Sequence, residues 1–240
     1  MVKYTWINVK GRNIMRIGMI VAMEREVEAL LLRAGKPLDT ESFGGFEVKI
    51  YEVGENELYV VRSGAGEIYA AGATQMLITK YDVKMIVNFG ICGGLTDDMA
   101  LCRAVVVEKV VHYDFDTSPV DNCEPARYLS YPDVYIPTST VLLKAALEAE
   151  PSLEPVICAS ADKFVADPER KRELNRLYGA KICEMEAAGI LLTADRAGVP
   201  VLMIKAVSDS VGGGADEFIV MVKEAADSCV RAMLSALERL

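Results

Sequence analysis

Hydrophobic and polar positions along the chain fall into short segments that alternate between two periods. Apolar runs too short for a helix predict buried strands over 16–22, 84–90, 155–161 and 199–209. Apolar residues at helical spacing predict helices over 23–35, 67–81, 140–150, 167–179, 184–198 and 215–240. Strands that alternate with helices are typical of a three-layer α/β fold, with a sheet between two layers of helices.

Three further segments refine this picture. Residues 46–53 and 57–63 flank Gly54–Glu55–Asn56 and predict a hairpin, which makes the sheet mixed rather than parallel. The valine-rich segment 100–114 predicts one long strand or two. Residues 115–137 contain four prolines and predict a long loop, a feature that is often functional in compact domains.

We expect one domain over 15–240, preceded by an N-terminal extension over 1–14, because Met15 begins the first clear strand. The hydrophobic fraction of 52% in 240 residues supplies a large core and excludes a disordered chain. The 26 basic and 35 acidic residues give a net charge of −9, which argues against nucleic acid or an anionic membrane as a partner. No apolar run reaches the 18 residues typical of a membrane span.

The counts of histidine and cysteine restrict the chemistry. His112 is the only histidine, so a metal site with two histidines is excluded, and acid-base catalysis must depend mainly on carboxylates. The six cysteines form no CxxC pair, and most lie in apolar runs. We interpret them as buried thiols of a cytoplasmic protein. The N-terminal residues lack the apolar region of a signal peptide.

Acidic or glycine-rich residues mark several predicted strand ends. They occur in the segments IVAMEREVEALL, SGAGE (63–67), FGICGGL (89–95), CEMEAAGI and KAVSDSVGGG. The two glycine-rich segments are interpreted as turns after strands, and neither matches a dinucleotide or P-loop motif. Taken alone, helix-dipole complementarity is the better explanation of the acids in IVAMEREVEALL, and ordinary turn preferences are the alternative explanation for the glycine-rich segments and for Asp209. Together, the segments predict a small-molecule site that works through carboxylates.

In this order and spacing, AMEREVEALL, SGAG, NFGICGGL, CEMEAAGI and KAVSDS resemble the nucleoside phosphorylase/nucleosidase superfamily. Within it, the chain is most similar to the 5′-methylthioadenosine/S-adenosylhomocysteine nucleosidases. The resemblance implies an α/β sandwich around a mixed, partly barrelled sheet, assembled as a homodimer. It implies hydrolysis of the N-glycosidic bond of a purine nucleoside, with release of adenine and with no metal or organic cofactor.

The resemblance also assigns roles by position. Glu26 would activate water, and Asp209 would protonate or hydrogen-bond N7 of the purine. Glu186 would bind the ribose, with Met185 beside the sugar and Glu184 in support.

Four further positions belong to the expected substrate site. Phe164 in SADKFV would stack on the base, and Val165 would offer backbone groups to its edge. Ser208 precedes the catalytic aspartate, and Ile91 lies beside the expected position of the attacking water.

Some positions depart from the pattern. Phosphorylases of this superfamily carry an arginine and a serine where this chain has Asn88 and Ile91, which favours water over phosphate as the nucleophile. Arg62 offers an alternative phosphate contact, so a phosphorylase stays the second hypothesis. Nucleosidases usually keep that serine as well, and they carry an arginine at Lys205 and an aromatic residue at Ala215.

These departures leave two alternatives open. One is hydrolysis of a different purine nucleoside, and the other is a nucleoside-binding protein without catalysis. The retained acids Glu26, Glu186 and Asp209 argue against the binding protein, because binding alone does not require a group that activates water.

Overall fold

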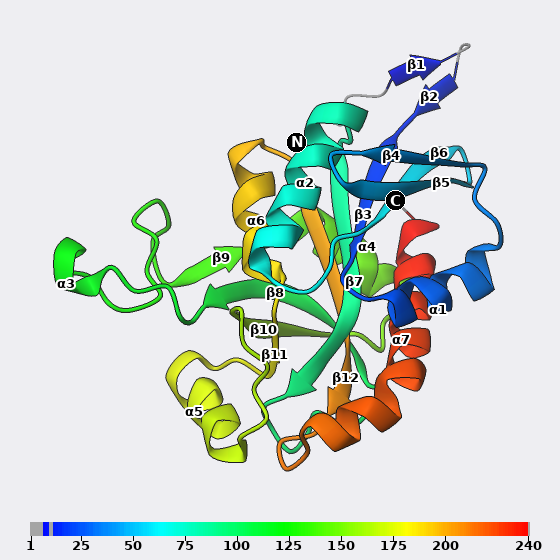
Figure 1. The fold of residues 1–240 in the computed structure, drawn as a ribbon. Helices are drawn as coiled ribbons and strands as arrows, with labels where there is room; N and C mark the ends of the chain where they lie inside the picture. The colour runs from blue at the N-terminus through cyan, green and yellow to red at the C-terminus, as the bar shows by residue number, and fades with distance from the viewer. Residues whose placement is uncertain (1–6, 10–11, 240) are drawn as a thin grey trace.

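The computed structural model describes residues 7–9 and 12–239 (Figure 1). The strands are β1 (Ile7–Val9), β2 (Arg12–Ile14), β3 (Arg16–Val21), β4 (Asp39–Phe43), β5 (Phe46–Val53), β6 (Asn56–Arg62), β7 (Met85–Gly94), β8 (Ala104–His112), β9 (Tyr135–Pro137), β10 (Glu154–Ser160), β11 (Ile182–Glu184) and β12 (Val201–Asp209). The helices are α1 (Glu24–Ala34), α2 (Glu67–Tyr81), α3 (Ser118–Asp121), α4 (Thr140–Ala149), α5 (Pro168–Tyr178), α6 (Ala187–Arg196) and α7 (Ala215–Leu237).

The central sheet is mixed and partly closed. Strands β7, β12, β8, β10 and β11 follow one another as hydrogen-bonded neighbours, and β11 pairs back with β7 to close a barrel. The sheet extends from β7 through β3, β6, β5 and β4. β12 runs parallel to β7 and antiparallel to β8, so the mixed, partly barrelled sheet expected from the resemblance is confirmed.

Helices cover both faces of this sheet. On one face, α7 packs on β12 and β7 and against α1 and α4. On the other, α2 and α6 pack together, with α2 lying on β3 (Figure 1). Two apolar clusters fill these interfaces, one containing Leu30, Phe89 and Met233 and the other containing Leu77 and Ile190. The three-layer α/β architecture follows from these two buried faces.

One predicted turn is wrong. We interpreted FGICGGL as a glycine-rich turn, but β7 continues to Gly94 and every residue of the strand is buried. Its glycines make room for neighbouring side chains and do not form a turn. A Cβ on Gly93 would lie 3.1 Å from both Asp209 Oδ2 and Cys183 Sγ. Strand β4 was missed because all five of its residues are exposed and carry no apolar alternation.

The proline-rich segment 115–137 forms an arm at one side of the molecule (Figure 1). It contains α3 and ends in β9, which pairs with β8. Phe115 and Tyr128 stack at its base with ring centroids 3.9 Å apart.

Within the described residues, no helix has both the length and the apolar character needed to cross a bilayer. All six cysteines are free thiols.

Candidate active site

A cavity of about 90 Å³ lies where the ends of β3, β11 and β12 meet the C-terminal part of β7. The predicted site residues that line it are Glu26, Ile91, Phe164, Glu184, Met185, Glu186, Ser208 and Asp209. A larger groove of about 1140 Å³ runs between α1 and α7, but it contains none of the predicted residues. We therefore place the candidate active site in the smaller cavity.

Glu26 reaches the cavity from the first turn of α1. Its Oε2 accepts a hydrogen bond from the Met23 N–H at 2.8 Å, and its Oε1 accepts one from the Ile91 N–H at 2.9 Å. Gly90 makes room for it, since a Cβ there would lie 3.0 Å from Oε1. Burial raises the pKa of the Glu26 carboxyl, and the two N–H groups offset part of this shift. Such a carboxylate suits a general base.

Asp209 lies at the end of β12 and is 1% exposed. Its Oδ1 accepts a hydrogen bond from Ser208 Oγ at 2.9 Å. Its Oδ2 accepts one from the ammonium Nζ of Lys171 at 2.5 Å. Lys171 comes from α5 and is completely buried. Asp209 and Lys171 therefore form a buried ion pair beside the cavity.

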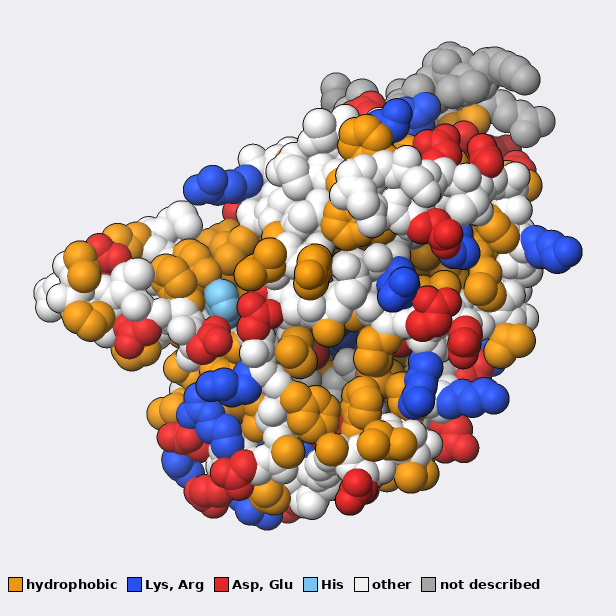
Figure 2. All heavy atoms as spheres, viewed as in Figure 1, with side chains coloured by type: hydrophobic (Ala, Val, Ile, Leu, Met, Phe, Trp, Pro, Cys, Tyr) orange, Lys and Arg blue, Asp and Glu red, His pale blue; other side chains and the backbone are white. Residues whose placement is uncertain are grey.

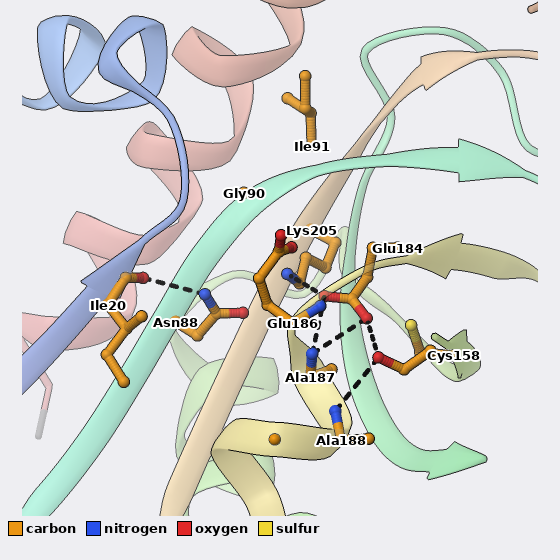
Figure 3. A network of polar contacts seen from close by, with 12 residues as sticks. Ile20, Asn88, Gly90, Ile91, Cys158, Glu184, Glu186, Ala187, Ala188 and Lys205 are labelled. Atoms are coloured by element: carbon orange, nitrogen blue, oxygen red, sulfur yellow. Dashed lines mark hydrogen bonds and ion pairs between the residues drawn. The ribbon is translucent and has the colours of Figure 1, made fainter. Parts of the chain in front are cut away.

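Glu184 forms a second buried ion pair. Its Oε2 accepts from Lys205 Nζ at 2.9 Å, and the Ala187 N–H at the start of α6 also donates to it (Figure 3). Burial raises the pKa of Glu184, but the Lys205 ammonium and a hydrogen bond from Ser160 outweigh burial and lower it. Glu184 is thus the ionised member of the acidic cluster.

Two more buried acids lie beside Glu184. Glu186 accepts a hydrogen bond from the Gly66 N–H at 3.0 Å, and burial together with the Glu184 charge raises its pKa to about 7. Glu67 begins α2, and burial together with the same charge raises its pKa to about 8.

Two carboxyl groups of this cluster contact the same serine hydroxyl. The Ser160 hydroxyl has a single hydrogen, yet it lies 2.5 Å from Glu67 Oε1 and 2.6 Å from Glu184 Oε1. One of these carboxyls must therefore carry a hydrogen. The raised pKa of Glu67 assigns it to Glu67, while Glu184 keeps its charge beside Lys205.

Aromatic side chains form the outer wall. Phe164 and Phe218 both line the cavity and meet edge to face, with ring centroids 5.4 Å apart. Val165 does not line it, because its side chain packs in an apolar cluster with Leu174 of α5. The expected contact of the Val165 backbone with a base stays a prediction.

Residues 16–240 match the family model described as the Phosphorylase superfamily. The chain belongs to this superfamily. The 5′-methylthioadenosine/S-adenosylhomocysteine nucleosidase of Shewanella pealeana is 34% identical over 93% of this chain and 100% of its own length. The nucleosidase of the same name from Shewanella halifaxensis is 33% identical over the same shares. The resemblance inferred from the motifs is confirmed.

Solved structures agree on the fold. The Helicobacter pylori 5′-methylthioadenosine/S-adenosylhomocysteine nucleosidase with butyl-thio-DADMe-Immucillin-A matches with a TM-score of 0.90 and 24% identity, over 95% of this chain and 100% of that chain. The futalosine hydrolase of Helicobacter pylori matches with a TM-score of 0.89 and 24% identity, over 95% and 99%. The nucleoside phosphorylase-like fold is therefore confirmed.

The residues considered above as phosphate ligands make other contacts in this protein. Asn88 Nδ2 donates to the Ile20 carbonyl of β3 at 2.9 Å (Figure 3), and Asn88 does not line the cavity. Arg62 pairs with Glu24 at 3.0 Å, with both side chains more than half exposed. Ile91 contributes its main-chain N–H to Glu26, a contact that does not depend on the side chain at this position.

Sequence reasoning missed several residues of this site. Lys171 stands three positions before the buried Leu174, so a lysine on the apolar face of a helix was the available signal. Glu67 follows a glycine turn and resembles an ordinary acid at a helix start. Ser160 and Phe218 carried no distinguishing pattern. Among the described residues, no group of three or more His, Cys, Asp or Glu side chains is placed to hold a metal ion.

Proposed function

We propose that this protein hydrolyses the N-glycosidic bond of a purine nucleoside, 5′-methylthioadenosine or S-adenosylhomocysteine, and releases adenine. The observation that carries the proposal is the convergence of two buried acids, Glu26 and Asp209, on one cavity that also contains Glu186. Both curated relatives above bear the name of this nucleosidase.

The two acids suit the two halves of the reaction. Cleavage passes through a sugar with oxocarbenium character, which needs a base for water and a proton for the departing purine. Glu26 accepts the proton of the attacking water. Asp209 protonates N7, so that the electrons of the breaking bond are accepted by a neutral purine. Glu186 accepts hydrogen bonds from the ribose hydroxyls, with Met185 beside the sugar.

Substrate entry requires the outer wall to move. The cavity of about 90 Å³ is smaller than the roughly 300 Å³ or more of typical ligand pockets. Phe164 is 43% exposed and meets Phe218 across the mouth. We propose that these rings separate to admit the base and that Phe164 then stacks on it.

Water rather than phosphate acts as the nucleophile. Asn88 is held by β3, and the Arg62 guanidinium is paired with a carboxylate, so neither offers a free bidentate grip on phosphate. The test is to incubate the protein with methylthioadenosine, adenosylhomocysteine, adenosine and inosine, with and without phosphate. We expect free ribose or a 5′-substituted ribose, according to the nucleoside, in both conditions. Ribose 1-phosphate that forms only with phosphate would identify a phosphorylase, and binding without turnover would identify a nucleoside-binding protein.

We also propose a homodimer formed through the start of α2 and the arm. Ile68 and Tyr69 of α2 and Val120 and Leu129 of the arm are exposed apolar side chains. Figure 2 shows hydrophobic side chains over much of the arm. A stable interface would bury more than roughly 1,000 Å² in total. Light scattering at micromolar concentration should give the mass of two chains, and Leu129→Glu should lower it to one. A wild-type monomer would contradict this assembly.

The remaining expectations are consistent with this assignment. We propose a cytoplasmic location, supported by six free thiols, of which four are buried. We propose that residues 15–240 act as one domain, supported by a family match that begins at residue 16. The expected extension over 1–14 falls partly outside the described residues.

A further inference from the structure

Lys171 is a buried charge that the proposed reaction has not yet used. Its Nζ donates to Asp209 Oδ2 at 2.5 Å, to the Ser210 carbonyl at 2.6 Å and to the Gly213 carbonyl at 3.3 Å. These contacts use all three hydrogens of the ammonium group. Burial of a lysine with no exposed surface costs free energy unless the ammonium is fully paired, so these three acceptors are needed to keep Lys171 charged.

The contacts around Asp209 place the available proton on this lysine. The oxygen Oδ2 accepts from an ammonium, and Oδ1 accepts from Ser208 Oγ. Ser208 Oγ also lies 3.1 Å from the Cys92 carbonyl, so its one hydrogen is shared between two acceptors. The ion pair with Lys171 stabilises Asp209 as a carboxylate, so the acidic hydrogen nearest to its Oδ2 is one on the Lys171 ammonium.

We propose that Lys171 supplies the proton that Asp209 delivers to purine N7. The inference rests on the proposed function and deepens it, because it assigns the origin of the leaving-group proton. Lys171 contacts Asp209 and does not line the cavity, so it is a positioning residue that acts through the aspartate.

The step balances in atoms and charge. As the bond between C1′ and N9 breaks, its electron pair stays on the purine and N7 takes a proton from Asp209. Asp209 takes a proton from the Lys171 ammonium, which becomes a neutral amine, and the aspartate ends ionised. Water adds to C1′, and its proton passes to Glu26. After the products leave, Glu26 returns a proton to solvent and Lys171 regains one.

A purely structural alternative makes a different prediction. Lys171 also ties α5 to the segment 210–213, and Glu217 holds the same segment from α7 through the Ser210 N–H. Any cation of suitable length would preserve this tie. Arginine keeps the charge and the donors, but its guanidinium cannot be deprotonated in proteins. Arginine at this position therefore separates holding the loop from giving a proton.

The experiment compares Lys171→Arg and Lys171→Met with wild type on methylthioadenosine. We expect both variants to lose about 100- to 10,000-fold in kcat, the usual range for an acid-base group, with KM within about tenfold. Affinity for 5′-methylthiotubercidin, whose purine has carbon in place of N7, should stay within about threefold. Wild-type turnover by Lys171→Arg would overturn the proposal.

A double-mutant cycle with Asp209→Asn tests whether Lys171 acts through the aspartate. Residues that work as one unit give non-additive losses. We therefore expect Lys171→Arg to add less than about threefold to the loss caused by Asp209→Asn. Fully additive losses would overturn the relay, even where each variant folds and binds. A wild-type protein that hydrolyses none of the nucleosides would instead refute the proposed function itself.

Discussion

The cavity has two buried carboxylates that share a residue class and a degree of burial but differ in their partners. Glu26 is 2% exposed and Asp209 is 1% exposed. Main-chain N–H groups of Met23 and Ile91 hold Glu26, and its pKa is raised by burial. Asp209 is paired with the ammonium of Lys171 at 2.5 Å. The difference lies in what surrounds each acid, not in how deeply it is buried.

This contrast explains how a protein with one histidine can carry out acid-base chemistry. Neutral N–H donors leave the Glu26 carboxylate able to accept a proton from water. In the proposed relay, the neighbouring ammonium of Lys171 is the proton source for Asp209. When two carboxyl groups have different surroundings, one can act as the base and the other as the acid.

The largest expected effect comes from Asp209→Asn. The amide keeps the shape and removes the titratable oxygen, so kcat should fall by about two to four orders of magnitude, with nucleoside affinity within about tenfold. Steady-state kinetics with methylthioadenosine measure both. Asp216→Asn, which alters an acid in the first turn of α7, is the matched control and should keep wild-type turnover. If Asp209→Asn also keeps it, Asp209 is only a turn residue.

Glu26→Gln should lose about 100-fold or more in kcat, through the water rather than through the leaving group. The amide must direct an N–H toward Met23 N–H or Ile91 N–H, which leaves one donor unpaired and should cost about 1–3 kcal/mol of stability. Thermal unfolding measures that cost. Glu28→Gln, two positions along the same helix and exposed, is the control. Normal turnover by Glu26→Gln would show that Glu26 is not the group that activates water.

Much of the fold was predictable because strands and helices alternate with clear apolar periods. Helix 67–81 has the predicted bounds, and the hairpin around Gly54 is present. The closure of the barrel was not readable from the pattern, because β11 has only three residues and its pairing with β7 depends on residues far apart in sequence. The resemblance, rather than the periodicity, supplied the barrel.

The candidate site was likewise predictable only in part. Eight of the nine residues expected by position line one cavity. Their partners were not predictable, because Lys171 meets Asp209 across 38 positions and Ser160 meets Glu67 across 93. Such contacts depend on how helices pack on the sheet. A lysine on a helix face carries no sequence signal for the carboxylate that it reaches.

The pH dependence of activity should test Glu26 as the base. Glu26 must be ionised to accept a proton, and its pKa is raised by burial. The value of kcat/KM should therefore fall by about tenfold per pH unit once the pH drops below that raised pKa. Stopped assays across pH 4–9 measure this limb. A flat profile through this acidic range would show that Glu26 is not the base.

A smaller effect concerns stability. Glu67 and Glu186 have pKa values raised to about 8 and about 7 from an ordinary value of 4.5, so the folded protein binds their protons more tightly than the unfolded chain. Stability of the free protein should therefore decline as the pH rises from about 4.5 to about 8. Glu67→Gln removes one of these groups and should flatten the decline. Melting temperatures measured across this range test the sign, and a rise in stability toward pH 8 would contradict it.

The smallest expected effect on turnover comes from Ile91→Ser, which restores the serine typical of the superfamily. The contact from position 91 to Glu26 is made by the main-chain N–H, and this substitution keeps it. We therefore expect kcat within about threefold of wild type. The Ile91 side chain is 7% exposed and packs in the core cluster, so its loss should lower stability by roughly 2–5 kcal/mol, as for other large-to-small core changes. Kinetics below the melting transition separate the two effects. A tenfold or larger gain in kcat would show that a hydroxyl at this position assists the water, and that Glu26 and its two N–H donors are an incomplete account of the nucleophile side.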